Sequence, residues 1–272
     1  MTNSITWRQS LIFYNRYGNG DTPVFCFHGY GESAEHYRFL DKEASLQQFS
    51  FLAIDLPWHS QTKWKEPLNW TAEELHELLI AILVNENLAP SNPFYIIGFS
   101  MGGRIALDYY EHYPQLVSKL ILLAPDGIRK SPWYWFSTQT LPGKFIFKNT
   151  MEHPTLFFRL LTIGKKLGLV NASIFKFVYY YIGDAEARGM LYKRWITFRK
   201  FYPSVSRCRQ EIKKHNTPVR LLLGRHDRII LPAYGQRLAK NLKDQVMVRI
   251  VPTGHQILQA KHKEEIVSAV LS

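Results

Sequence analysis

One short segment of the chain combines a serine hydroxyl with the two glycines that a sharp turn requires. Residues 98–102 read Gly-Phe-Ser-Met-Gly, after an apolar run that begins at Phe94 and before a pattern that favours a helix. A serine on a tight strand-to-helix turn is held in a strained conformation, with its hydroxyl clear of the sheet. The start of the helix then favours negative charge that develops there. The segment predicts Ser100 as a nucleophile, although the same pentapeptide also occurs in ordinary turns and helix caps.

A serine hydroxyl attacks efficiently only when an imidazole takes its proton and a carboxylate orients that imidazole. Two strand-like runs downstream end at residues of these types. Residues 219–224 lead into Asp227, and residues 246–251 lead into His255. The resulting order of serine, acid and histidine suits three strand ends of one parallel sheet. We expect Ser100, Asp227 and His255 to form a catalytic triad.

A negatively charged oxygen in acyl transfer needs two hydrogen-bond donors aimed at one point. We assign the backbone N–H of Met101, directly after the serine, as the first donor. The second is the backbone N–H of Tyr30, because Gly29 and Gly31 let this loop approach a substrate closely. His28 in the same loop is interpreted as a brace and not as a base.

The triad acid has one alternative. Asp126 follows a strand-like run at 119–124, so it also lies at a strand end. The spacing to His255 favours Asp227 over Asp126.

These residues need a framework whose strands end near one point. Strand-like runs cover residues 11–17, 23–27, 51–55, 94–99, 119–124, 219–224 and 246–251. Helical patterns intervene at 34–48 and at 71–87, where Thr71 and Glu74 fit a capping box. Apolar strands separated by helices indicate an α/β protein with a mostly parallel sheet covered on both faces, and an antiparallel start at the N-terminus.

Charge and composition separate one segment from the rest. The chain has 272 residues, of which 46% are hydrophobic, and a formal net charge of +12. Residues 128–214 hold 17 Lys and Arg but only 4 Asp and Glu, so this segment carries almost all of the excess. It is also rich in aromatic residues and has no run that would continue the sheet. We expect a core of residues 1–127 and 216–272, with residues 128–215 inserted as a helical cap.

The basic insertion has several interpretations. It can attract anionic substrates, such as carboxylates or a coenzyme A thioester, or associate weakly with anionic lipid. It can equally be a solvated surface around the aromatic core of the cap. No nucleic-acid-binding module is recognised, so we expect no nucleic acid as a partner. The pattern gives no indication of the oligomeric state.

The remaining composition points to a reduced protein without a cofactor. The N-terminus does not resemble a secretory signal, and no apolar run approaches the roughly twenty residues that span a bilayer. Cys26 and Cys208 are far apart, and no Cys/His spacing suggests zinc. We therefore expect a cytoplasmic protein that needs no metal and no organic cofactor.

Taken together, the motifs resemble the α/β-hydrolase fold superfamily, in the serine-nucleophile branch with a helical cap after the sixth strand. The matching pieces are His28-Gly29-Tyr30-Gly31, residues 55–60, Gly98 to Gly103, Asp227 and Gly254-His255. They cover about residues 20–130 and 215 to the end, whereas the cap matches nothing. The resemblance implies a doubly wound sheet of eight strands, the Ser-Asp-His triad and the two backbone oxyanion donors.

Some positions depart from the pattern of this family and narrow the chemistry. Glycine is usual where Trp58 and Ser60 stand, and Trp58 either walls the pocket or packs the loop. Relatives that open epoxides or remove halides carry aspartate in place of Ser100. Relatives that cleave carbon–carbon bonds often carry tryptophan after the histidine, where this chain has Gln256.

The resemblance favours a carboxylesterase or a lipase that cleaves a carboxylic ester, or a thioester, through an acyl-enzyme. A small-molecule ester or acyl compound is then the substrate. The alternatives are a carbon–carbon hydrolase of the meta-cleavage-product type and a ligand-binding protein that uses the fold without catalysis. Acyl transfer to an acceptor other than water would use the same residues.

Overall fold

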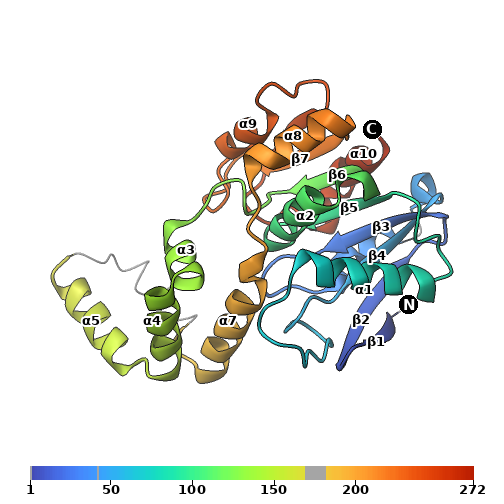
Figure 1. Ribbon diagram of the computed structural model, residues 1–272. Coiled ribbons are helices and arrows are strands. Elements are labelled where there is room, and N and C mark those ends of the chain that lie inside the picture. Colours follow the sequence, from blue (N-terminus) through green and yellow to red (C-terminus); the bar gives the residue numbers. More distant parts are fainter. Residues whose placement is uncertain (1, 42, 169–181) are drawn as a thin grey trace. The chain divides into compact units, whose positions relative to one another are not determined.

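The computed structural model describes residues 2–41, 43–168 and 182–272 (Figure 1). Eight strands form one sheet in the order β1-β2-β4-β3-β5-β6-β7-β8. Pairing is antiparallel between β1 and β2 and between β2 and β4, and parallel from β4 onward. The strands are β1 (Thr2–Trp7), β2 (Ser10–Tyr17), β3 (Thr22–Phe27), β4 (Phe49–Ile54), β5 (Phe94–Phe99), β6 (Val117–Leu123), β7 (Val219–Gly224) and β8 (Val246–Val251). The predicted eight-stranded, mostly parallel sheet is confirmed.

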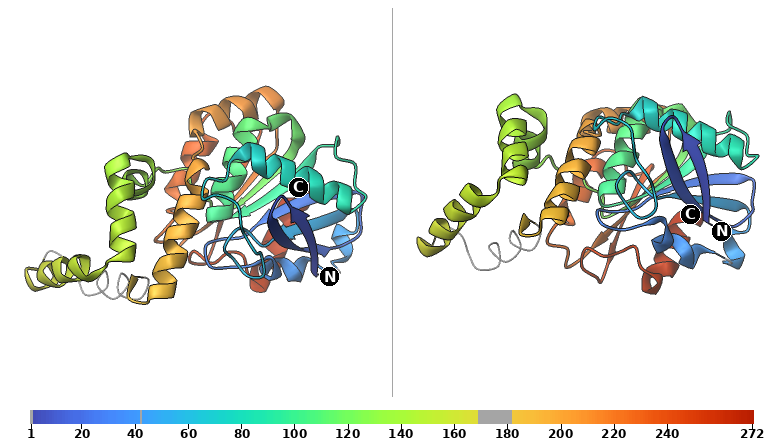
Figure 2. Two further views of the ribbon diagram at one scale, coloured as in Figure 1. Left: turned by 60° about the horizontal axis from the view of Figure 1, so that its bottom comes forward. Right: turned by 90° about the horizontal axis from the view of Figure 1, so that it is seen from below.

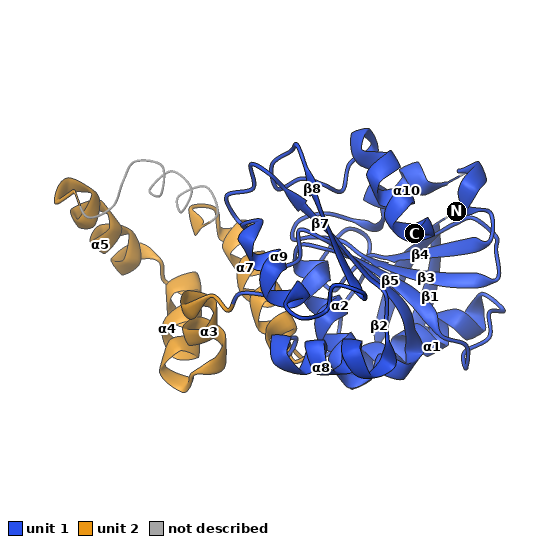
Figure 3. Cartoon of the chain, turned by 90° about the horizontal axis from the view of Figure 1, so that it is seen from above, with its two compact units in different colours: residues 1–66, 70–129, 200–272 blue, residues 67–69, 130–199 orange. Residues whose placement is uncertain are grey.

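Helices cover both faces of this sheet, which is why its central strands are apolar throughout. All six residues of β4, for example, are buried. Neighbouring helices α1, α2 and α8 line one face, and α10 lies beside η1 on the other (Figures 2 and 3). The helices of this part of the chain are α1 (Ala72–Asn85), α2 (Met101–His112), α8 (Val205–His215), α9 (Ala233–Ala239) and α10 (Lys263–Leu271).

Two local predictions for helices have different outcomes. The capping box of α1 is confirmed, because the Glu74 N–H donates to Thr71 Oγ1 at 3.3 Å and the Thr71 N–H donates to Glu74 Oε2 at 3.2 Å. The helical stretch expected near 34–48 is present, but it consists of two short 3₁₀ helices, η1 (Ala34–Leu40) and η2 (Ala44–Leu46). The buried residues of η1 recur every third position, which matches the three residues per turn of a 3₁₀ helix.

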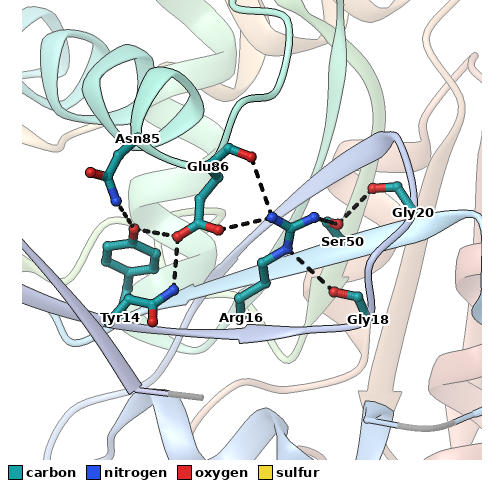
Figure 4. A network of polar contacts seen from close by, with 8 residues as sticks. Tyr14, Arg16, Gly18, Gly20, Ser50, Asn85 and Glu86 are labelled. Carbon is teal, nitrogen blue, oxygen red and sulfur yellow. Dashed lines mark hydrogen bonds and ion pairs between the residues drawn. The ribbon is translucent and has the colours of Figure 1, made fainter.

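A partly buried ion pair ties β2 to the end of α1 (Figure 4). Arg16 Nη1 lies 2.9 Å from Glu86 Oε2, and Arg16 Nη2 donates to Ser50 Oγ at 2.9 Å. Burial opposes the charge on Glu86, but hydrogen bonds from Tyr14, Arg16 and Asn3 outweigh it and lower the pKa of this carboxyl. The network fixes the antiparallel start of the sheet to the first helix.

The chain divides into two compact units (Figure 3). The core unit comprises residues 1–66, 70–129 and 200–272, and the inserted unit comprises residues 67–69 and 130–199. The expected boundary at 215 therefore lies too far along the chain. Helix α8 belongs to the core unit because it packs against α2 and buries Cys208 and Ile212.

The inserted unit is helical, as the sequence predicts for most of that segment. Its helices are α3 (Pro132–Gln139), α4 (Leu141–Glu152), α5 (Thr155–Lys166) and α7 (Ala185–Thr197). A small cluster of Phe147, Met151 and Ile196 forms its buried core. The aromatic run at 175–181 lies outside the described residues. Across the described ranges, no helix has both the length and the apolar character needed to cross a membrane.

Candidate active site

Ser100 occupies a strained turn between β5 and α2. Its backbone has φ 50° and ψ −114°, a conformation that side-chain-bearing residues rarely adopt. Hydrogen bonds from the neighbouring strand hold this geometry: the Ser100 N–H donates to Leu123 O at 3.0 Å, and Ser100 O accepts from the Asp126 N–H at 2.9 Å. The turn leaves the serine side chain partly accessible while its neighbours are buried.

The glycines around Ser100 are required by close packing. A Cβ on Gly98 would lie 2.6 Å from Gly102 O, and a Cβ on Gly102 would lie 2.1 Å from Phe27 O. Both distances are well below van der Waals contact. The prediction that these positions must lack side chains is confirmed.

The structure brings Ser100, Asp227 and His255 into one hydrogen-bonded chain. His255 Nε2 lies 2.9 Å from Ser100 Oγ, and His255 Nδ1 lies 2.7 Å from Asp227 Oδ2. The other oxygen of Asp227 accepts from the backbone N–H groups of Ile229 and Ile230, at 2.7 and 2.9 Å. The Asp227 side chain is fully buried and that of His255 is 15% exposed. A fixed carboxylate therefore faces an imidazole that can still reach solvent and substrate.

The alternative acid, Asp126, has other partners. Its Oδ2 lies 3.2 Å from Arg104 Nη1, and its Oδ1 accepts from the Gly127 N–H at 2.7 Å. Asp126 thus braces the chain that leaves β6, and the carboxylate bonded to His255 is that of Asp227.

The loop that carries Tyr30 follows β3 and is held by hydrogen bonds of the His28 ring. His28 is fully buried, and its Nε2 accepts from the Leu56 N–H at 3.1 Å. The proton of this ring is therefore on Nδ1, which donates to Gly29 O at 2.8 Å. This geometry agrees with the interpretation of His28 as a brace.

Two residues of the segment after β4 adopt a backbone conformation that is usually found at glycine. Trp58 and Ser60 have φ values of 64° and 47°, both in the left-handed region. Between them the His59 ring is buried and packs against His28, with ring centroids 4.9 Å apart. The His59 ring also lies beside the Tyr30 ring, with centroids 6.1 Å apart, so this segment packs against the Tyr30 loop although two of its residues are in the left-handed region.

A family model of the α/β hydrolase fold matches residues 22–259. The chain belongs to the α/β hydrolase family. It is a hydrolase with the eight-stranded sheet, and the match spans both the turn at Ser100 and the loop that carries His255.

Individual α/β hydrolases share this architecture at low sequence identity. An uncharacterized hydrolase of Bacillus subtilis is 26% identical over 262 residues, covering 94% of this chain and 91% of the relative. A monoacylglycerol lipase of Xenopus laevis is 21% identical over 292 residues, covering 95% and 81%. The solved structure of the thioesterase domain from the curacin biosynthetic pathway has a TM-score of 0.67 at 14% identity, covering 100% of this chain and 99% of that one.

Among the residues that the structure describes, no group of three or more His, Cys, Asp and Glu could hold a metal ion.

One residue of the site was missed by the sequence reasoning. Glu32 Oε2 accepts from the Gly29 N–H at 2.9 Å, directly before the assigned donor Tyr30. Burial raises the pKa of Glu32, while the Gly29 N–H and the charges of His36 and His255 act in the opposite direction. The position of Glu32 directly after Gly31 was the feature of the sequence that could have indicated this contact.

Proposed function

We propose that this α/β hydrolase cleaves carboxylic esters through an acyl-enzyme, with Ser100 as nucleophile, His255 as base and Asp227 as the orienting acid. The single observation that supports this assignment best is the continuous chain of hydrogen bonds, 2.7 Å from Asp227 to His255 and 2.9 Å from His255 to Ser100. The resemblance to a monoacylglycerol lipase and to a thioesterase domain supports ester or thioester substrates.

In the first half of the reaction His255 Nε2 takes the proton of Ser100 as Oγ attacks the carbonyl carbon. Asp227 keeps the proton of the ring on Nδ1 and stabilises the positive imidazolium. The N–H groups of Tyr30 and Met101 are assigned to the developing oxyanion, and each such donor lowers the barrier by about 3 kcal/mol. His255 then protonates the leaving alcohol or thiol.

The second half reverses these roles with water. His255 removes a proton from water, the hydroxide attacks the acyl carbon, and Ser100 Oγ leaves with the proton from the ring. A different acceptor in place of water would give acyl transfer. Each proton and each bond in these steps is handled by the residues already named, so the proposal includes no metal and no organic cofactor.

The test is the variant Ser100→Ala, with turnover of p-nitrophenyl butyrate as the measurement. Loss of the nucleophile should reduce kcat by at least about 10⁴-fold while the unfolding temperature is kept. Ser206→Ala, an exposed serine on α8, is the matched control. Labelling of the wild type but not of Ser100→Ala by a fluorophosphonate probe would separate an enzyme from a passive ligand-binding protein. Unchanged turnover in Ser100→Ala would contradict the proposal.

A second part of the proposal concerns the partner of the inserted unit. Four apolar residues of α5 and its C-terminal end recur at helical spacing and are more than half exposed: Leu156, Leu160, Ile163 and Leu167. Basic residues, Lys165 and Lys166, occupy the last turn. An apolar stripe beside basic residues suits the surface of an anionic membrane.

Sedimentation with phosphatidylserine-containing and with pure phosphatidylcholine vesicles tests this association. The wild type should bind the anionic vesicles at low salt, and Leu160→Ser/Ile163→Ser should bind them several-fold more weakly. Equal behaviour of both proteins, or no dependence on lipid charge, would favour an ordinary solvated surface.

The free, buried thiols of Cys26 and Cys208 suit a reducing compartment, and the cytoplasm remains our proposed location.

A further inference from the structure

The peptide groups on both sides of Gly29 are held by hydrogen bonds. The Gly29 N–H donates to the Glu32 carboxylate at 2.9 Å. The Gly29 carbonyl accepts twice, from His28 Nδ1 at 2.8 Å and from the Glu32 N–H at 3.3 Å. Glu32 therefore contacts the glycine through its side chain and through its backbone.

These contacts determine where the Tyr30 N–H points. A trans peptide group is planar, so its carbonyl and its N–H point in opposite directions. The carbonyl of Gly29 and the N–H of Tyr30 belong to the same peptide group, and the described peptide bonds are all trans. Because His28 and Glu32 hold the carbonyl from one side, the Tyr30 N–H is directed to the other side. The rotation of this group is limited further by the bond from the preceding Gly29 N–H to the Glu32 carboxylate.

Glu32 also lies beside the ring that contacts the imidazole of the site. A Cβ built on Gly29 would lie 3.0 Å from Glu32 Oε2 and 2.9 Å from Phe99 Cδ1, so both side chains meet at this glycine. The Phe99 ring in turn packs against His255, with centroids 5.3 Å apart.

We propose that Glu32 is a positioning residue of the active site, which orients the Tyr30 N–H toward the oxyanion. This inference rests on the function proposed above. The hydrogen bond from the Gly29 N–H needs only an acceptor on this side chain, so a neutral isostere should preserve the orientation of the loop.

Two substitutions test this role. Glu32→Gln keeps an acceptor for the Gly29 N–H but removes the charge, and Glu32→Ala removes both. We expect kcat of Glu32→Ala to fall by roughly ten- to hundredfold with little change in KM, less than the loss of a whole oxyanion donor. Glu32→Gln should retain kcat within about threefold at its pH optimum.

Rescue by the conservative variant is the readout that a merely structural role would not move: kcat should fall in Glu32→Ala and return in Glu32→Gln, with KM unchanged in both. Glu264→Gln, at an exposed position on α10, is the control and should leave kcat and KM unchanged.

The rate of Ser100 labelling by a fluorophosphonate, measured beside ester turnover, distinguishes the two proposals. If Ser100→Ala abolishes labelling and turnover but both Glu32 variants match the wild type in rate, the role of Glu32 is wrong and the proposed function stands. If the wild type neither labels nor turns over esters, the proposed function fails and the role of Glu32 falls with it. Slow labelling by Glu32→Ala, restored in Glu32→Gln, supports the inference.

Discussion

The two units of this hydrolase differ in how firmly their residues are fixed. In the core unit Ser100, Asp227 and His255 follow the strands β5, β7 and β8 of one sheet, in which β5 and β7 are paired on both sides and β8 on one side. In the inserted unit α5 has no buried residue among those described, and the buried cluster consists of Phe147, Met151 and Ile196. The comparison indicates that the proposed chemistry depends on the sheet of the core unit.

The largest effect is expected in the core unit, from Asp227→Asn. An amide at this position no longer fixes the proton of His255 on Nδ1, although Ile229 and Ile230 can still bond to its oxygen. We expect kcat for p-nitrophenyl butyrate to fall by about 10⁴-fold, with a small change in the unfolding temperature. Asp126→Asn is the comparison, because Asp126 pairs with Arg104. A larger loss in Asp126→Asn than in Asp227→Asn would reverse the assignment of the acid.

The next effect concerns the stability of the inserted unit. Phe147 packs against Trp195 and Tyr192, with ring centroids 5.3 and 5.5 Å away, in its small core. Phe147→Ala should lower the free energy of unfolding of this unit by about 3 kcal/mol, while Phe145→Ala on the same helix, 72% exposed, should change it by less than about 0.5 kcal/mol. Calorimetry should then show an early transition for the inserted unit, ahead of an unchanged one for the core. A single transition that shifts as a whole would show that the two units unfold together.

The smallest effect is a pH dependence within the core unit. Burial raises the pKa of Asp108 to about 6. The folded protein therefore binds this proton more tightly than the unfolded chain does between about pH 4 and pH 6, so Asp108 reduces stability progressively as the pH rises through this range. Asp108→Asn should gain about 1–2 kcal/mol relative to the wild type when the pH is raised from 4 to 8.

Urea unfolding at both pH values is the measurement for Asp108→Asn. The exposed Asp244 provides the control, because Asp244→Asn removes a charge without relieving burial. A parallel pH dependence of Asp108→Asn and the wild type would mean that Asp108 is ionised at no cost in the folded protein.

Most of the fold could be predicted from the sequence, because several apolar runs are followed closely by glycine, serine, aspartate or histidine. The apolar run predicts a buried parallel strand, and the polar residue after it indicates which edge of the sheet has polar side chains. Since parallel strands end at one edge, Ser100, Asp227 and His255 could be expected together despite their separation along the chain. The hydrogen bonds between them agree with that expectation, and their catalytic roles remain a proposal.

Other features could not be predicted because their signals are ambiguous. Charge density distinguished residues 128–215 from the rest of the chain. However, charged residues indicate only which side of a helix is exposed, and not which unit its buried side packs against. Helix α8 carries basic residues and still buries Cys208 and Ile212 against the core unit. Glu32 was overlooked for a similar reason: a loop carboxylate is usually solvated, whereas this one accepts a hydrogen bond from a backbone amide of its own loop.

Helix α2 contacts the chain both where it leaves the core unit for the inserted unit and where it returns. Arg104 pairs with Asp126 where the chain departs, Asp108 accepts from the Tyr202 N–H at 2.7 Å, and Glu111 accepts from the Ser204 N–H at 2.6 Å where it returns. A chimaera that exchanges residues 130–199 for another helical cassette keeps all three anchors. One that is cut at residue 215 discards two of them, together with the packing of α8. Exchange of residues 130–199 therefore leaves the contacts of the helix that follows Ser100 in place.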